Sequence, residues 1–270
     1  MNDDRSLDPF LGRIVEGDNV ATLRQFPDDC VDLTTTSPPY DALRTYGGLE
    51  WDFDALSAEL FRVTKPGGVV VWIVNDQTVD GDQSGTSFEQ ALAFKRLGFK
   101  LWQTMIWVKP SFQPGDGRFR YHDAFEFMFV LAKGRPRTTN IIRDVPATIP
   151  GRVKRSNSDR RRNEKAPTVA SKPWVHPEFS FRTNVWSNPT VAQSGDEFAS
   201  NHPAAFPEGL VRDHVLTWST DGDVILDPFA GSGTTCRVAK DNARRFVGIE
   251  RNPEFVELAR RRLAQQVLGF

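Results

Sequence analysis

Six consecutive apolar residues, Val69 to Val74, constrain the fold of this chain more than any other stretch of its sequence. A strand without a polar face is typical of the centre of a parallel sheet, because helices cover both sides of such a sheet. Segments with the apolar spacing of helices flank this run, at Phe53–Thr64 and Ser87–Leu97. The alternation of short strands with helices predicts an α/β fold with a doubly wound, mostly parallel sheet.

The same alternation recurs on both sides of one long irregular segment. Further helices are expected at Asn19–Phe26, Pro207–Trp218, Ser232–Asp241 and Pro253–Gln266. Further strands are expected at Gly12–Gly17, Val31–Thr36, Trp102–Val108, Ala124–Ala132, Asp223–Leu226 and Arg245–Ile249. This order predicts one catalytic domain made of residues 1–133 and 202–270, interrupted by an insertion at 134–201.

The predicted insertion is rich in Arg, Pro, Ser and Asn and keeps no period. It is too long for a plain loop in a compact domain. From Lys133 to Arg182 there are thirteen Lys or Arg against four Asp or Glu, although the whole chain has a net charge of −1. This asymmetry favours a nucleic-acid-facing lobe on an acidic body, with a solvated loop as the alternative.

Cysteine, histidine and hydropathy patterns exclude several other classes. Cys30 and Cys236 are the only cysteines, which argues against a disulfide framework and a Cys-based zinc site. The four histidines show no metal spacing, so no metal is expected. No apolar run approaches the ~18 residues of a membrane span, and the acidic N-terminus is unlike a signal peptide. A soluble, cytoplasmic protein without membrane association is therefore predicted.

The expected strand Val31–Thr36 ends in an unusual corner, Ser37-Pro38-Pro39-Tyr40. Each proline fixes φ and removes a backbone donor, and the residue before each proline is pushed to extended geometry. The resulting loop is stiff, and its carbonyls lie beside a hydroxyl and an aromatic ring. We expect it to accept hydrogen bonds from a donor group on a flat partner.

A second corner follows the strand Asp223–Leu226, where Asp227 and Pro228 lead into Gly231 and Gly233. Glycines let a ligand approach the backbone, and Glu250, about twenty residues later at the next strand tip, can accept from ribose hydroxyls. Cys236 replaces the third glycine of a dinucleotide motif, and Asp227 would repel a pyrophosphate. A cationic cofactor without phosphate, such as S-adenosylmethionine, fits better than a dinucleotide. The alternative is a tight turn without a ligand.

Together the two corners, TSPPY at Thr36–Tyr40 and DPFAGSGTT at Asp227–Thr235, resemble the DNA amino-methyltransferases that modify cytosine N4 or adenine N6. The proline motif precedes the glycine motif, which is similar to the permuted order called the β group. Further stretches agree: Arg62–Gly68 (RVTKPGG), Trp107–Pro110 (WVKP), His202–Pro207 (HPAAFP) and Phe246–Glu250 (FVGIE). The resemblance covers nearly the whole chain outside the basic segment. It implies a Rossmann-like S-adenosylmethionine methyltransferase fold with an inserted target-recognition lobe.

The resemblance also implies roles for individual residues. The catalytic positions would be Ser37, Pro38, Pro39 and Tyr40, with Tyr40 stacking on a base held out of the duplex. The cofactor positions would be Asp18, Phe206, Pro207, Asp227, Pro228, Phe229, Gly231, Ser232, Gly233, Thr234 and Glu250. Helix N-capping is an equal alternative for Asp18. Helix-entry packing is the alternative for Phe206 and Pro207.

The implied substrate is double-stranded DNA. Serine at position 37 favours cytosine N4, because the adenine enzymes of the family usually carry Asp or Asn there. The candidate phosphate contacts are Arg152, Lys154, Arg155, Arg160, Arg161 and Arg162. A cognate restriction endonuclease is a further partner to consider, and the chain would act as a monomer or homodimer.

Three rival interpretations remain open. The same chemistry on RNA or on a protein glutamine is disfavoured, since those families usually show Asn before the prolines. A DNA-binding module with a dead site is disfavoured by the intact Ser37, Tyr40 and Glu250. A nicotinamide oxidoreductase is disfavoured by Asp227 and Cys236.

Overall fold

The computed structural model describes residues 5–39, 51–113, 118–151, 153–154, 174–187 and 207–265. The chain divides into two compact units. The first comprises Met1–Asn140 and Asn184–Phe270, and the second comprises Ile141–Thr183.

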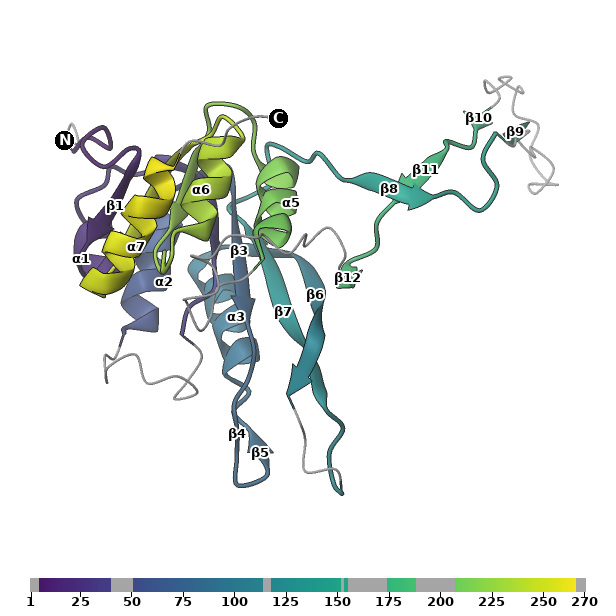
Figure 1. Cartoon of the computed structure of the whole chain (residues 1–270), viewed down its shortest axis with the longest axis horizontal. Helices are drawn as coiled ribbons and strands as arrows, with labels where there is room; N and C mark the ends of the chain where they lie inside the picture. Colours follow the sequence, from purple (N-terminus) through teal and green to yellow (C-terminus); the bar gives the residue numbers. More distant parts are fainter. Residues whose placement is uncertain are drawn as a thin grey trace. The chain divides into compact units, whose positions relative to one another are not determined.

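An eight-stranded sheet forms the centre of the first unit, in the order β1-β14-β13-β2-β3-β7-β6-β12 (Figure 1). Its strands are β1 (Arg13–Glu16), β2 (Val31–Thr36), β3 (Thr64–Val74), β6 (Lys100–Gln113), β7 (Asp123–Ala132), β12 (Val185–Ser187), β13 (Val224–Asp227) and β14 (Arg245–Glu250). All neighbours from β1 to β3 are parallel. Strand β7 is antiparallel to β3 and β6, and β12 is parallel to β6. The prediction of a mostly parallel sheet is confirmed.

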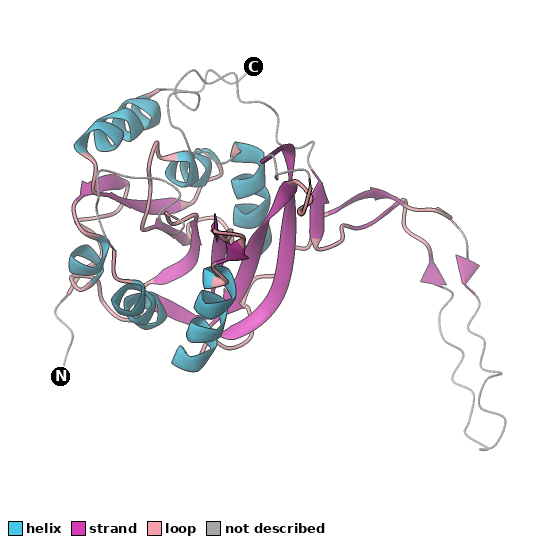
Figure 2. Cartoon of the chain, turned by 90° about the horizontal axis from the view of Figure 1, so that it is seen from below, coloured by secondary structure: helices cyan, strands magenta, loops and turns pink. Residues whose placement is uncertain are grey.

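Helices cover both faces of this sheet (Figure 2). They are α1 (Asn19–Leu23), α2 (Phe53–Val63), α3 (Thr86–Leu97), α5 (Glu208–Trp218), α6 (Thr234–Asp241) and α7 (Pro253–Ala264). One apolar cluster joins the sheet to α1, α2 and α3 through residues such as Leu23, Leu60 and Phe94. The other joins the opposite face to α5, α6 and α7. The doubly wound arrangement is therefore confirmed.

The apolar run in β3 explains how the two layers share one sheet. Val69, Val71 and Ile73 belong to the cluster on one face, whereas the alternate residues Val70, Trp72 and Val74 belong to the other. None of the six is more than 2% exposed. A central strand with helices on both sides leaves no position for a polar side chain.

Strand β3 begins earlier than the sequence predicts. The composition of Lys65-Pro66-Gly67-Gly68 predicts a break between helix and strand, but β3 already starts at Thr64. Thr64 pairs with Val31, and a register shift precedes the pairing of Val69 with Leu33. Pairing with β2 at both ends of the irregularity holds the Pro-Gly-Gly segment in the sheet.

Residues 134–140 and 184–187 fall in the predicted insertion but belong to the first unit, where β12 extends the sheet. The first unit also holds a small hairpin of β4 (Thr78–Val79) and β5 (Asp82–Gln83). The second unit contains two antiparallel ribbons. They pair β8 (Arg143–Pro146) with β11 (Phe179–Phe181), and β9 (Val153–Lys154) with β10 (Trp174–Val175). A recognition role for residues 134–201 stays a prediction.

Among the residues that the structure describes, no helix has both the length and the hydropathy needed to cross a bilayer.

Candidate active site

Four predicted site residues follow four adjacent strands of the sheet. Asp18 follows β1, Glu250 ends β14, Asp227 ends β13 and Ser37 follows β2. These strands are parallel neighbours in this order, so their carboxyl ends lie along one edge. Ligands of open α/β sheets bind outside the carboxyl ends of the strands. The topology therefore gathers these residues at one ligand-binding edge.

The diproline corner and the glycine loop are joined directly. Leu33 and Thr34 of β2 pair with Ile225 and Leu226 of β13. Beyond this pairing, the Thr36 hydroxyl donates to Asp227 Oδ1 at 2.7 Å, across 191 residues of sequence. A second cross-link comes from the Thr235 hydroxyl, which donates to the Thr35 carbonyl at 3.3 Å. The expected placement of the two corners at neighbouring strand tips is confirmed.

The corner after β2 is only partly open to solvent. Pro38 is buried, whereas Ser37 and Pro39 are half-buried. A half-buried hydroxyl next to a proline, which has no backbone donor, is suited to accept from an incoming amino group. Tyr40 lies outside the described residues, so its stacking role stays a prediction.

Asp227 is 1% exposed. Burial raises the pKa of its carboxyl to about 6, while hydrogen bonds from the Thr36 hydroxyl and the Phe229 N–H oppose that rise. Because burial disfavours an uncompensated negative charge, the carboxylate gains most from a cation placed beside it. Asp227 therefore favours a ligand with a positive group.

Two glycines shape the loop that follows Asp227. Gly231 has φ 51° and Gly233, the N-cap of α6, has φ 79°. Residues with a Cβ rarely adopt these angles. Pro228, Ser232 and Thr234 of this segment are buried, whereas Phe229 is half-buried.

Glu250 ties the glycine loop to the tip of β14. Its Oε2 accepts from the Gly231 N–H and its Oε1 from the Asn252 N–H, both at 2.8 Å. A carboxylate has about four acceptor positions, so two backbone bonds leave capacity for hydroxyl donors. Gly248, two residues earlier, leaves no space for a side chain, because an added Cβ would lie 2.6 Å from Ile14 Cδ1.

Asp18 caps α1, with its Oδ1 accepting from the Ala21 N–H at 2.9 Å. The capping interpretation is confirmed, and contact with a cofactor stays a prediction. Pro207 is the N-cap residue of α5, while Phe206 lies outside the described residues.

Of the predicted DNA contacts, only Lys154 lies in the described part of the chain, in β9. The others, Arg152, Arg155, Arg160, Arg161 and Arg162, lie outside it.

Sequence reasoning missed three neighbours of the site. Thr36 reads as an ordinary strand residue, although it directly precedes Ser37. Asn19 is buried, and its side-chain amide donates to the Pro228 carbonyl at 3.4 Å. The Trp51 ring meets Phe229 edge-on, with centroids 5.1 Å apart. No signal in the sequence points to Trp51, which is distant from both motifs.

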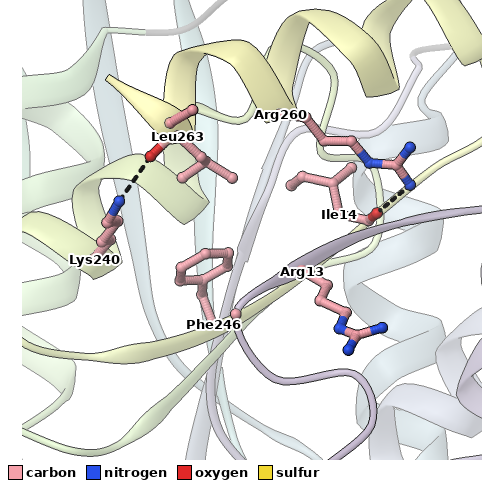
Figure 3. Close-up of a pocket in the computed structure, with 8 residues that line it drawn as sticks. Arg13, Ile14, Lys240, Phe246, Arg260 and Leu263 are labelled. Atoms are coloured by element: carbon pink, nitrogen blue, oxygen red, sulfur yellow. Dashed lines mark hydrogen bonds between the residues drawn. The ribbon is translucent and has the colours of Figure 1, made fainter. Parts of the chain in front are cut away.

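One hollow, of about 630 Å³, lies away from these residues. Figure 3 shows Arg13, Phe246, Arg260 and Leu263 around it. Arg13 begins β1, and Phe246 lies at the start of β14. The hollow is therefore at the amino edge of the sheet, and none of the predicted site residues line it.

The donor set at the carboxyl edge suits S-adenosylmethionine better than a phosphate-bearing cofactor. Asp227 and Glu250 provide two carboxylates on adjacent strands, which would repel phosphate. The same carboxylates suit a ligand with an ammonium, a sulfonium and a ribose diol. Within the described residues, no cluster of His, Cys, Asp or Glu could hold a metal ion.

Comparisons with known proteins agree with this chemistry. A family model described as DNA methylase, for N6 and N4 enzymes, matches residues 31–261. The orphan methyltransferase M.BamHII of Bacillus amyloliquefaciens is 42% identical over 89% of this chain and 91% of its own length. The DNA adenine methyltransferase YhdJ of Escherichia coli K12 is 30% identical over 93% of this chain and 82% of its own.

A solved structure is similar over almost the full length. TTHA0409, a DNA modification methylase from Thermus thermophilus complexed with S-adenosyl-L-methionine, has a TM-score of 0.62 and 26% sequence identity. The match covers 96% of this chain and 95% of that chain.

Proposed function

Because this chain belongs to the DNA methylase family of N6 and N4 enzymes, we propose that it methylates the exocyclic amino group of a base in double-stranded DNA. S-adenosyl-L-methionine is the methyl donor, and cytosine N4 is the favoured acceptor. One observation carries the proposal most directly. The 2.7 Å hydrogen bond between Thr36 and Asp227 places the corner that would receive the amine beside the loop that would hold the donor.

The donor supplies an electrophilic methyl group on a sulfonium. The acceptor nitrogen is a poor nucleophile, because its lone pair is delocalised into the base. Ser37 Oγ and the Pro38 carbonyl accept hydrogen bonds from the amino hydrogens and thereby localise that lone pair. The C–S bond breaks as the N–C bond forms, and the methylated amine then releases a proton to solvent. No side chain with a high pKa is required.

The rest of the site positions the two reactants. Asp227 and the loop Phe229–Thr234 hold the methionine end, and Glu250 accepts from the ribose hydroxyls. Asp18 accepts from the adenine amino group with the lone pairs that the helix cap leaves. Phe206 and Pro207 line the methionine side. Tyr40 stacks on a base turned out of the duplex.

Adenine N6 is the second candidate acceptor. The YhdJ relative, 30% identical, is named a DNA adenine methyltransferase, whereas Ser37 favours cytosine. A serine hydroxyl accepts a hydrogen bond from either amine, so the two reactions need the same residues. Nucleoside mass spectrometry of methylated DNA separates them by the mass of the modified base.

The experiment that tests the proposal uses labelled S-adenosyl-L-methionine with duplex DNA. Label in the DNA is the expected result. Cofactor binding without transfer would favour a DNA-binding module with a dead site, and absence of cofactor binding would contradict the proposal as a whole. Transfer to RNA or protein but not to DNA would change the substrate.

The basic segment is proposed to bind the phosphate backbone. Replacement of Arg160, Arg161 and Arg162 by glutamine should weaken DNA binding and lower the slope of log K against log salt by about 0.9 per lost contact. Fluorescence anisotropy across a salt series measures this slope.

A matched control replaces three exposed cations of the first unit, Lys95, Arg96 and Lys100, by glutamine. An unchanged slope after loss of the three arginines, or the same change in the control, would remove the phosphate role. A cognate endonuclease and the choice between monomer and homodimer stay predictions.

A further inference from the structure

Arg262 is the one Lys or Arg among the buried residues of the described chain, and its side chain is 0% exposed. It lies in the last turn of α7. Taking a cation out of water costs several kcal/mol unless partners compensate for the lost hydration. The partners of Arg262 therefore show which parts of the fold this buried charge holds together.

The guanidinium contacts two segments outside its own helix. Its Nη1 donates to Thr234 Oγ1 at 2.9 Å, and to the carbonyl and the hydroxyl of Ser232, each at 3.2 Å. Its Nη2 donates to Glu208 Oε1 at 2.6 Å. Ser232 and Thr234 flank Gly233 at the end of the glycine loop, and Glu208 is the first residue of α5.

We propose that Arg262 is a positioning residue for the cofactor, which fixes the glycine loop and the start of α5 relative to each other. This inference rests on the proposed function, because that function assigns Ser232, Thr234 and Pro207 to the cofactor site. Arg262 itself acts from behind the loop. The fork of the guanidinium sets the spacing between the two segments by contacting acceptors on both.

The pairing with Glu208 also matters for the charge of the ligand. The N-terminus of α6 carries a partial positive charge from the helix dipole, and Arg262 adds a full one beside it. A sulfonium donor would be repelled if that cation were uncompensated. Glu208 neutralises the guanidinium, so the cation can order the loop without opposing a positive ligand.

Lysine cannot replace this arrangement. It has three donors on one nitrogen, whereas arginine offers five in a planar fork that contacts separate acceptors at once. In Arg262→Lys we expect the dissociation constant for S-adenosyl-L-methionine to rise about tenfold or more, with DNA affinity unchanged. In Glu208→Gln we expect a rise in the same direction, because the cation keeps its loop contacts but loses its counter-charge.

Arg261 provides the matched control. It is the adjacent residue of α7, its side chain is 68% exposed, and its partner Glu257 is 56% exposed. Arg261→Lys and Glu257→Gln should leave cofactor affinity unchanged. Calorimetric titration with S-adenosyl-L-methionine is performed at a temperature where circular dichroism shows every variant folded.

The outcomes separate positioning from a purely structural role. A lower Tm with an unchanged cofactor dissociation constant in both Arg262→Lys and Glu208→Gln would overturn the inference, as would equal shifts in the Arg261 control. If Arg262→Lys does not fold, Glu208→Gln decides by the same criterion. Loss of cofactor binding by the parent protein would instead contradict the proposed function.

Discussion

Replacement of Ser37 by alanine is expected to lower the rate of methyl transfer by about 100-fold or more, because one of the two groups that accept from the amine is removed at the reacting centre. Cofactor affinity should stay unchanged, since the assigned cofactor contacts come from other strands. Single-turnover transfer from labelled S-adenosyl-L-methionine measures the rate, and calorimetric titration measures the affinity. Tyr40→Ala should show the same separation.

Ser6→Ala serves as the control for Ser37→Ala, since Ser6 is exposed and its hydroxyl accepts from the nearby Asp8 N–H. A comparable loss of cofactor affinity in Ser37→Ala would show that the corner belongs to the cofactor site. An unchanged transfer rate would remove Ser37 from the reaction.

The replacement of Asp227 by asparagine is expected to separate stability from function. Asparagine keeps an Oδ1 that can accept from the Thr36 hydroxyl and the Phe229 N–H, but it carries no charge. The free energy of unfolding should therefore rise at pH 7, while the dissociation constant for the cationic donor should rise about ten- to 100-fold. Thermal melts and calorimetric titration of the two proteins measure these opposite changes.

The pH dependence of stability gives the sign of the Asp227 effect. Burial raises the pKa of its carboxyl from 3.8 to about 6, so between these values the folded state binds more protons than the unfolded state. Stability from this group is therefore full below about pH 4 and falls as the pH rises to 6, by about 3 kcal/mol. Asp227→Asn should lack this decrease, which the difference between the two denaturation series isolates.

Cofactor binding should depend on the same ionisation in the opposite sense. A positive ligand favours the carboxylate form, so the affinity of the parent protein should fall as the pH drops below about 6. The affinity of Asp227→Asn should change less over this range. Equal pH profiles for the two proteins would show that Asp227 does not contact the charge of the ligand.

The sheet and the edge that carries the site are predictable from the sequence because both depend on local signals. The apolar run of β3 and the two corners after β2 and β13 are short patterns with direct backbone consequences. The beginning of β3 is harder to predict, because Pro66 and the glycines have the composition of a turn, while pairing with β2 holds them in the sheet.

The supporting contacts are not predictable in this way, since they join residues that are distant in the chain. Thr36 and Asp227 are 191 positions apart, and no local pattern pairs a strand threonine with a remote acid. Arg260, Arg261 and Arg262 form one basic run, which is typical of a solvated helix face. Only tertiary packing distinguishes Arg262, because its direction on α7 points it toward Ser232 and Glu208.

The strand order has a consequence for synthesis of the protein on the ribosome. Strands β13 and β14 are translated after the other strands of the sheet but occupy the positions between β1 and β2. Until they emerge, the nascent chain leaves the long-finished β2 with an unpaired edge, which is a template for aggregation. A chain that terminates before Val224 would keep this open edge permanently and would require chaperones or rapid degradation.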